Sequence, residues 1–188
     1  QIPVFPPQVS PGHYPNTGDV LLMSTVLPWD NDFLTHLTLY PLWGMTVIAV
    51  YALARELRAP RSAAMAAGAL VVLIPAVAVP ALVSELVDIV ALFGIAVGLT
   101  FLVRHHRSGR TSELVVAGVA LGIAFGTKWY AVSNVAAIVG VWALARLIAG
   151  AGLGTVVRQG LAMTGLVTAT GGIWLLRNLV ESGNPFHP

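Results

Sequence analysis

The chain has 188 residues, of which 56% are hydrophobic and only 10% charged, and its formal net charge is +2. A mean hydropathy of +0.81 exceeds what a single soluble core needs and indicates a chain that folds in a lipid bilayer. The basic residues stand singly or in small groups between apolar runs, without the aromatic-rich basic patch of a nucleic-acid binder, and the absence of cysteine excludes thiolate metal sites.

The first 33 residues are polar and rich in proline, so we expect a loop or a short surface helix outside the bilayer. Within this segment Asp30 and Asp32 are candidates for a general base or for metal ligands, and a turn followed by a helix cap is the alternative reading. The chain starts at Gln1 without a secretory leader and stops at Pro188 directly after a polar turn. We therefore expect it to be part of a longer membrane protein.

Six transmembrane helices are predicted, because a hydrocarbon core of about 30 Å needs about 20 apolar residues per helix. The predicted spans are residues 34–54, 63–83, 86–103, 114–127, 131–147 and 161–176. Pro75 and Pro80 predict a kink or a re-entrant tip in the second span. The apolar run from Leu114 to Ile148 would reach roughly 52 Å as one helix, which is too long for one crossing, so we place a hairpin at Lys128.

The predicted fold class is therefore all-α, a polytopic transmembrane helix bundle over residues 34–176, with residues 1–33 and 177–188 outside the bilayer on the same face. In this topology eight arginines share one side, namely Arg55, Arg58, Arg61, Arg104, Arg107, Arg110, Arg146 and Arg158. The positive-inside rule assigns that side to the cytoplasm. On the other side lie Lys128 and Arg177, together with six of the carboxylates, Asp19, Asp30, Asp32, Glu85, Asp88 and Glu181.

Lys128 and Arg177 are candidates for binding a phosphate at the outer membrane surface, since both stand at the end of a predicted span. The alternative is snorkelling, in which a long basic side chain only ends a helix. Glu85 is explained by the helix dipole in the first turn of the third span, whereas Asp88 lies one turn deeper, where a charge is costlier and more often functional.

The glycines and histidines of the sequence are interpreted as structural residues. Gly118, Gly122 and Gly126 repeat every four residues and predict a smooth ridge against another helix. The segment Gly150–Gly154 follows no strand, so it is read as a linker and not as a phosphate-binding loop. His105 and His106 lie in an arginine-rich loop and are interpreted as a solvated pair, not as a metal site.

Three segments, taken in order, resemble motifs of one enzyme family. They are residues 121–130 (LGIAFGTKWY), 174–178 (WLLRN) and 182–188 (SGNPFHP). Each is similar to a stretch of the bacterial GT-C superfamily glycosyltransferases, which are related to protein O-mannosyltransferases and aminoarabinose transferases. Tyr14-Pro15, Pro75 and Asp88 fit the same order, whereas His187 stands where the family often has tyrosine.

The resemblance implies transfer of a sugar from a polyprenyl-phosphate donor to an acceptor on the extracytoplasmic face of a bacterial cytoplasmic membrane. It implies that Lys128 and Arg177 lie near the donor phosphate, with Glu85, Tyr130 and Asn184 as further candidates for binding substrate. The family's acidic catalytic motif would lie upstream of Gln1, so we expect this segment alone to be inactive. The partners implied are membrane lipid and the lipid-linked sugar; no cofactor is predicted, and the need for a divalent metal stays open.

Two other classes of function remain open on the sequence. A transporter or flippase segment would carry ionisable residues at mid-membrane, whereas these lie at the ends of spans. In a non-catalytic membrane scaffold, Asp88, Lys128 and Arg177 would have no reason to converge.

Overall fold

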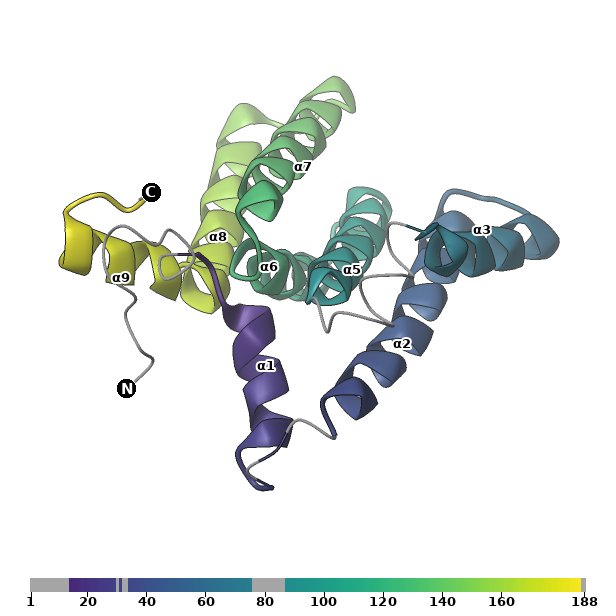
Figure 1. The fold of residues 1–188 in the computed structure, drawn as a ribbon. Coiled ribbons are helices and arrows are strands. Elements are labelled where there is room, and N and C mark those ends of the chain that lie inside the picture. The colour runs from purple at the N-terminus through teal and green to yellow at the C-terminus, as the bar shows by residue number, and fades with distance from the viewer. Residues whose placement is uncertain (1–13, 30, 32–33, 76–86, 187–188) are drawn as a thin grey trace.

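The structure is a computed structural model that describes residues 14–29, 31, 34–75 and 87–186. Over these residues it contains helices and connecting turns only, in agreement with the predicted all-α class (Figure 1). The helices are α1 (Thr17–Val26), α2 (Thr35–Glu56), α3 (Arg61–Leu73), α5 (Asp88–Ser108), α6 (Thr111–Phe125), α7 (Trp129–Ile148), α8 (Leu153–Gly171) and α9 (Ile173–Ser182).

Helix α6 is the centre of the bundle, because it packs against both α5 and α8, while α2 packs on the other side of α5. The predicted glycine ridge is confirmed as a packing surface. A Cβ atom at Gly118 would come within 2.8 Å of Leu166, and one at Gly122 within 3.0 Å of the Val167 Cα atom, both on α8. The absence of side chains at these positions therefore lets the two helix backbones approach closely.

The predicted break at Lys128 is confirmed. Helix α6 ends at Phe125, Lys128 has an extended backbone with φ −150° and ψ 147°, and α7 begins at Trp129. The first, third, fourth and fifth predicted spans correspond to α2, α5, α6 and α7, with ends that differ by a few residues.

The other two predicted spans differ from the structure. Helix α3 ends at Leu73, just before Pro75, and the remainder of the second span lies outside the described residues. The predicted sixth span is divided at Gly172 into α8 and α9, and α9 runs across the end of α8 instead of continuing it (Figure 1). The six-residue stretch from Arg177 to Ser182, expected to begin an outer loop, is therefore helical.

The carboxyl ends of α2, α5 and α7 meet at one end of the bundle, which we call the arginine end. Arg104 and Arg107 on α5 both contact Glu56 on α2, at 2.9 and 3.3 Å. Arg146 on α7 donates to the main-chain carbonyl of His106 over 3.4 Å. These contacts confirm that the loops after α2 and α5 and the end of α7 lie together, as the charge pattern predicted.

The interpretation of His105 and His106 as a solvated pair is wrong for His105. Its side chain is fully buried, its Nδ1 lies 2.9 Å from the carbonyl oxygen of Arg110, and its ring lies against Trp142. His106 is exposed. His105 therefore helps to fix the turn between α5 and α6 at the arginine end.

Two helices, α5 and α7, are long and apolar enough to cross a membrane, and α6 is a shorter apolar helix. Large apolar side chains on α7 lie on the protein surface, with Leu144 57% and Ile148 79% exposed. Such a surface suits lipid better than water. The number of six spans stays a prediction.

Candidate functional site

Lys128 lies in the turn between α6 and α7, at the end of the bundle opposite the arginine end. The turn is formed because α6 stops at its Gly126 cap and the extended backbone of Lys128 starts α7. The Lys128 ammonium lies 3.5 Å from Asp88 Oδ2, with 27% of the Lys128 side chain exposed. A cation is therefore held beside the amino ends of two helices, α5 and α7.

Asp88 forms this ion pair with Lys128. This carboxylate occupies the first turn of α5, where the helix dipole stabilises a negative charge. Its second oxygen, Oδ1, accepts a hydrogen bond of 2.8 Å from the Tyr130 hydroxyl. Three of the predicted site residues, Asp88, Lys128 and Tyr130, are thus brought together from two helices.

Asp19, in the first turn of α1, adds a second carboxylate near Lys128. Partial burial raises the pKa of Asp19 above its usual value, while the nearby Lys128 charge opposes that shift. The side chain nevertheless keeps an exposed surface, so the desolvation is incomplete. Sequence reasoning placed Asp19 on this side but did not single it out, because a carboxylate in a helix's first turn is common.

Arg177 lies on α9, which contacts the first turn of α1. Its guanidinium group stacks 5.0 Å over the Trp174 ring and lies 3.9 Å from Glu181, and 19% of the side chain is exposed. Trp174 in turn donates to Thr17 Oγ1 over 2.8 Å. The main-chain N–H of Thr17 donates to the Gly126 carbonyl over 2.8 Å. Lys128 and Arg177 therefore both border α1, which joins α9 to the turn between α6 and α7.

Asn184 has a role in the turn that follows α9. Its Oδ1 accepts a 3.0 Å hydrogen bond from the main-chain N–H of Phe186, and the Phe186 ring packs 6.3 Å from Trp129. The turn thus folds back beside Lys128, and nothing in the geometry assigns Asn184 to substrate. Asp30, Asp32 and Glu85 lie outside the described residues.

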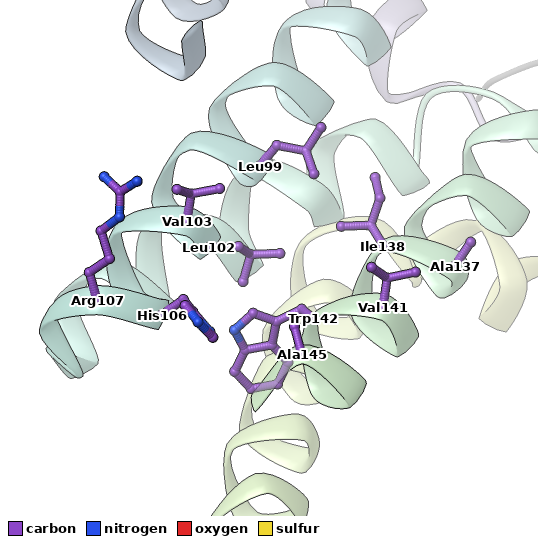
Figure 2. A pocket seen from close by; sticks show the side chains of 10 residues that line it. All are labelled: Leu99, Leu102, Val103, His106, Arg107, Ala137, Ile138, Val141, Trp142 and Ala145. Carbon is purple, nitrogen blue, oxygen red and sulfur yellow. The ribbon is translucent and has the colours of Figure 1, made fainter. Parts of the chain in front are cut away.

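We call this end the acidic end, defined by Asp19, Asp88, Lys128, Tyr130 and Arg177. It offers two cations, two helix amino ends and carboxylates that can accept protons, which suits binding and departure of a phosphate. Over the part of the chain that the structure describes, no three histidine, aspartate or glutamate side chains gather as a metal site. A cavity of about 450 Å³ between α5 and α7 lies at the arginine end, away from this cluster (Figure 2).

Comparison with known proteins identifies the family. Residues 25–180 match the family model of dolichyl-phosphate-mannose-protein mannosyltransferases, so the match covers most of the chain and every helix from α2 to α8. No curated protein and no solved structure matches the chain significantly. The matched segment includes both Lys128 and Arg177. The chain belongs to the dolichyl-phosphate-mannose-protein mannosyltransferase family of the GT-C glycosyltransferases, which are integral membrane enzymes that use lipid-linked sugars.

Proposed function

We propose that this chain is part of a membrane enzyme that transfers a sugar from a polyprenyl-phosphate donor to an acceptor at the acidic end. The family description makes a mannosyl donor and a protein hydroxyl the first substrates to test. The observation that carries the proposal is the position of Lys128, held by Asp88 between the amino ends of α5 and α7.

The charge balance at Lys128 suggests how a phosphate would enter. Lys128 already faces Asp88 and Asp19, so a phosphate would compete with these carboxylates for the ammonium group. Asp88 contacts Lys128 at 3.5 Å, longer than the usual 2.7–2.9 Å of a charge-assisted bond. The donor phosphate would take this position, and the Tyr130 hydroxyl would keep the displaced carboxylate nearby.

The reaction would then be a displacement at the anomeric carbon. The acceptor oxygen forms a bond to that carbon while the bond from the carbon to the phosphate oxygen breaks. Asp88, released from Lys128, accepts the proton of the acceptor hydroxyl. The departing lipid phosphate keeps the electron pair, and Lys128 and Arg177 stabilise its charge.

Removing the cations tests the phosphate site. In the complete enzyme we expect Lys128→Ala and Arg177→Ala each to weaken polyprenyl-phosphate binding or turnover by roughly ten- to a hundredfold, the usual effect of losing one charge-assisted contact. Arg158→Ala is the matched control, since Arg158 is exposed on α8 near the arginine end. If both variants glycosylate at the parental rate, the two cations are only snorkelling.

A substitution at Asp88 separates proton transfer from binding. Asp88→Asn keeps an oxygen that can accept from Tyr130 but removes the charge, so turnover should fall while affinity for polyprenyl phosphate is retained or increased. A variant with parental turnover would assign proton transfer to another group.

The side of the membrane is tested separately. We propose that the arginine end faces the cytoplasm and the acidic end faces outward. This chain has no cysteine, so in a full-length protein freed of any other cysteine Ser108→Cys and Ser182→Cys can each be labelled with an impermeant maleimide. Ser182→Cys should react in intact cells and Ser108→Cys only after permeabilisation. Labelling of both in intact cells would disprove this topology.

A further inference from the structure

The cavity between α5 and α7 is apolar and open along its side. Its lining comprises Leu99, Leu102, Val103, His106 and Arg107 on α5, and Ala137, Ile138, Val141, Trp142 and Ala145 on α7. Figure 2 shows Leu99 and Leu102 on α5 across the gap from Ile138 and Trp142 on α7, whereas the Arg107 side chain does not point toward α7. The volume of about 450 Å³ is within the range of small-molecule sites.

The depth of the cavity corresponds to one leaflet of a bilayer. The lining extends from Leu99 to Arg107 on α5, which is about 12 Å along the helix axis. That length is close to half of a hydrocarbon core of about 30 Å. A transmembrane helix of another protein would need a groove through both leaflets, whereas this one begins near the middle of α5 and opens at the arginine end.

The mouth of the cavity is cationic. Arg107 lines it and keeps 43% of its side chain exposed while contacting Glu56. Arg146 reaches across from α7 to the carbonyl of His106, and the exposed His106 also lines the opening. Arg107 and Arg146 thus place positive charge at this end of the cavity from the two helices.

Buried nitrogen atoms without partners add a second, independent observation. Trp142, whose side chain is only 5% exposed, has no acceptor for its Nε1–H among the described residues. The same is true of Nε of Arg146, one turn further along α7, and the Nε2 atom of the adjacent His105 also has no partner. In Figure 2 the indole nitrogen points toward His106 at the mouth. Such groups cost free energy unless an acceptor reaches them.

We propose that this cavity binds an anionic phospholipid of the leaflet at the arginine end. One acyl chain lies between α5 and α7, and the phosphate and ester oxygens accept from Arg146 and Trp142 once the exposed His106 ring moves aside, and from Arg107 once its side chain turns from Glu56 toward the mouth. The site lies at the opposite end from the donor site proposed above and does not depend on it. A polyprenyl phosphate is a poorer occupant, because its chain is longer than one leaflet is deep.

Photo-crosslinking tests the proposal. The full-length protein is reconstituted in phosphatidylcholine vesicles containing a trace of phosphatidylglycerol with a diazirine on its acyl chain. We expect cross-links mapped by mass spectrometry to residues 99–107 and 137–145. Phosphatidylcholine with the same diazirine chain should label these segments several-fold less, because its headgroup has no net charge.

Paired variants identify the cavity and its cations. Ala137→Trp fills the cavity and should abolish the labelling, whereas Ala136→Trp, at an exposed position on the same helix outside the lining, should preserve it. Arg107→Gln should reduce phosphatidylglycerol labelling by about tenfold. Glu56 keeps its contact with Arg104 in that variant, so the helix ends should stay joined. Arg158→Gln is the control for charge alone.

Three results would overturn the proposal. The first is equal labelling by the two phospholipids. The second is unchanged labelling of Ala137→Trp. The third is labelling of these segments by a photoactivatable polyprenyl phosphate when phosphatidylglycerol does not label them.

Discussion

The two ends of the bundle use charge differently. At the arginine end, Arg104 and Arg107 share one carboxylate, Glu56, so the cations are in excess and their side chains are 47% and 43% exposed. At the acidic end, Lys128 faces Asp88 and Asp19, so carboxylates are in excess around a cation that is 27% exposed. The first arrangement suits attraction to an anionic surface, and the second suits exchange of partners around one cation.

One buried tryptophan at each end also differs in its hydrogen bonding. Two tryptophans are almost equally buried, but Trp174 at the acidic end donates to Thr17 whereas Trp142 at the arginine end has no acceptor within the described part of the chain. The acidic end is therefore connected internally through α1, although Trp129 Nε1 beside Lys128 also has no partner among the described residues, whereas Trp142 at the arginine end is a donor that another molecule can use.

The largest expected effect concerns the close contact between α8 and α6 next to the acidic end. A Cβ atom at Gly171 on α8 would collide with the carbonyl oxygen of Gly122 and lie 2.8 Å from the main-chain nitrogen of Gly126. Both are backbone atoms, which cannot rotate away. We expect Gly171→Ala to lower the free energy of unfolding by about 1 to 3 kcal/mol or more, measured by denaturant unfolding in mixed micelles.

Gly160 on the same helix provides the control. A Cβ atom there would meet nothing within 4 Å, so Gly160→Ala should be neutral or stabilising by up to about 1 kcal/mol. Equal destabilisation by the two substitutions would mean that α6 and α8 are not in close contact at the acidic end.

A tryptophan pair tests the difference in hydrogen bonding. Both Trp174→Phe and Trp142→Phe remove similar volume from buried positions, but only the first also removes a hydrogen bond, of 2.8 Å to Thr17. We expect Trp174→Phe to cost about 1 kcal/mol more than Trp142→Phe in the protein freed of anionic lipid, measured by the same unfolding method. A larger loss for Trp142→Phe would contradict the contrast between the two ends.

Much of this arrangement was predictable from the sequence. The break at Lys128 followed from an apolar run too long for one crossing, and the structure ends α6 and begins α7 there. The grouping of the arginines at one end followed from their spacing between apolar runs. The glycine ridge followed from a four-residue repeat, and α8 packs on it. These are local or periodic signals, which a single sequence carries.

Other features depend on contacts between distant residues and were missed. The division of the sixth span at Gly172 was hidden because residues 161–176 carry no charge, and only the separate packing of α8 and α9 reveals it. The burial of His105 depends on Trp142, more than thirty positions away. The link from Trp174 to Thr17 joins residues 157 positions apart. No pattern within one segment predicts such pairs.

A smaller effect is expected at Tyr130. Tyr130→Phe removes the hydroxyl that donates to Asp88 over 2.8 Å, at an exposed position. The free energy of unfolding should fall by about 1 kcal/mol. This is less than for most hydrogen bonds to a charged group, because water can replace the lost hydroxyl at this exposed position. Tyr51→Phe on α2 is the control, since no hydrogen bond of the Tyr51 hydroxyl is found within the described residues. If the two variants lose equal stability, the Tyr130 bond contributes nothing measurable.

The smallest expected effect is the pH dependence at Asp19. Partial burial raises the pKa of Asp19 above its usual value, so the folded protein binds this proton more tightly than the unfolded chain does. The resulting stability is fully present below the unfolded pKa of about 3.9 and is lost as pH rises through the folded pKa. Asp19→Asn resembles the protonated form at every pH. The variant should therefore unfold at a slightly higher temperature than the parent at pH 7, and the difference should shrink toward pH 4. The gain is small because Asp19 keeps an exposed surface and Lys128 opposes the shift. A variant less stable than the parent at pH 7 would show that attraction to Lys128 outweighs desolvation at this carboxylate.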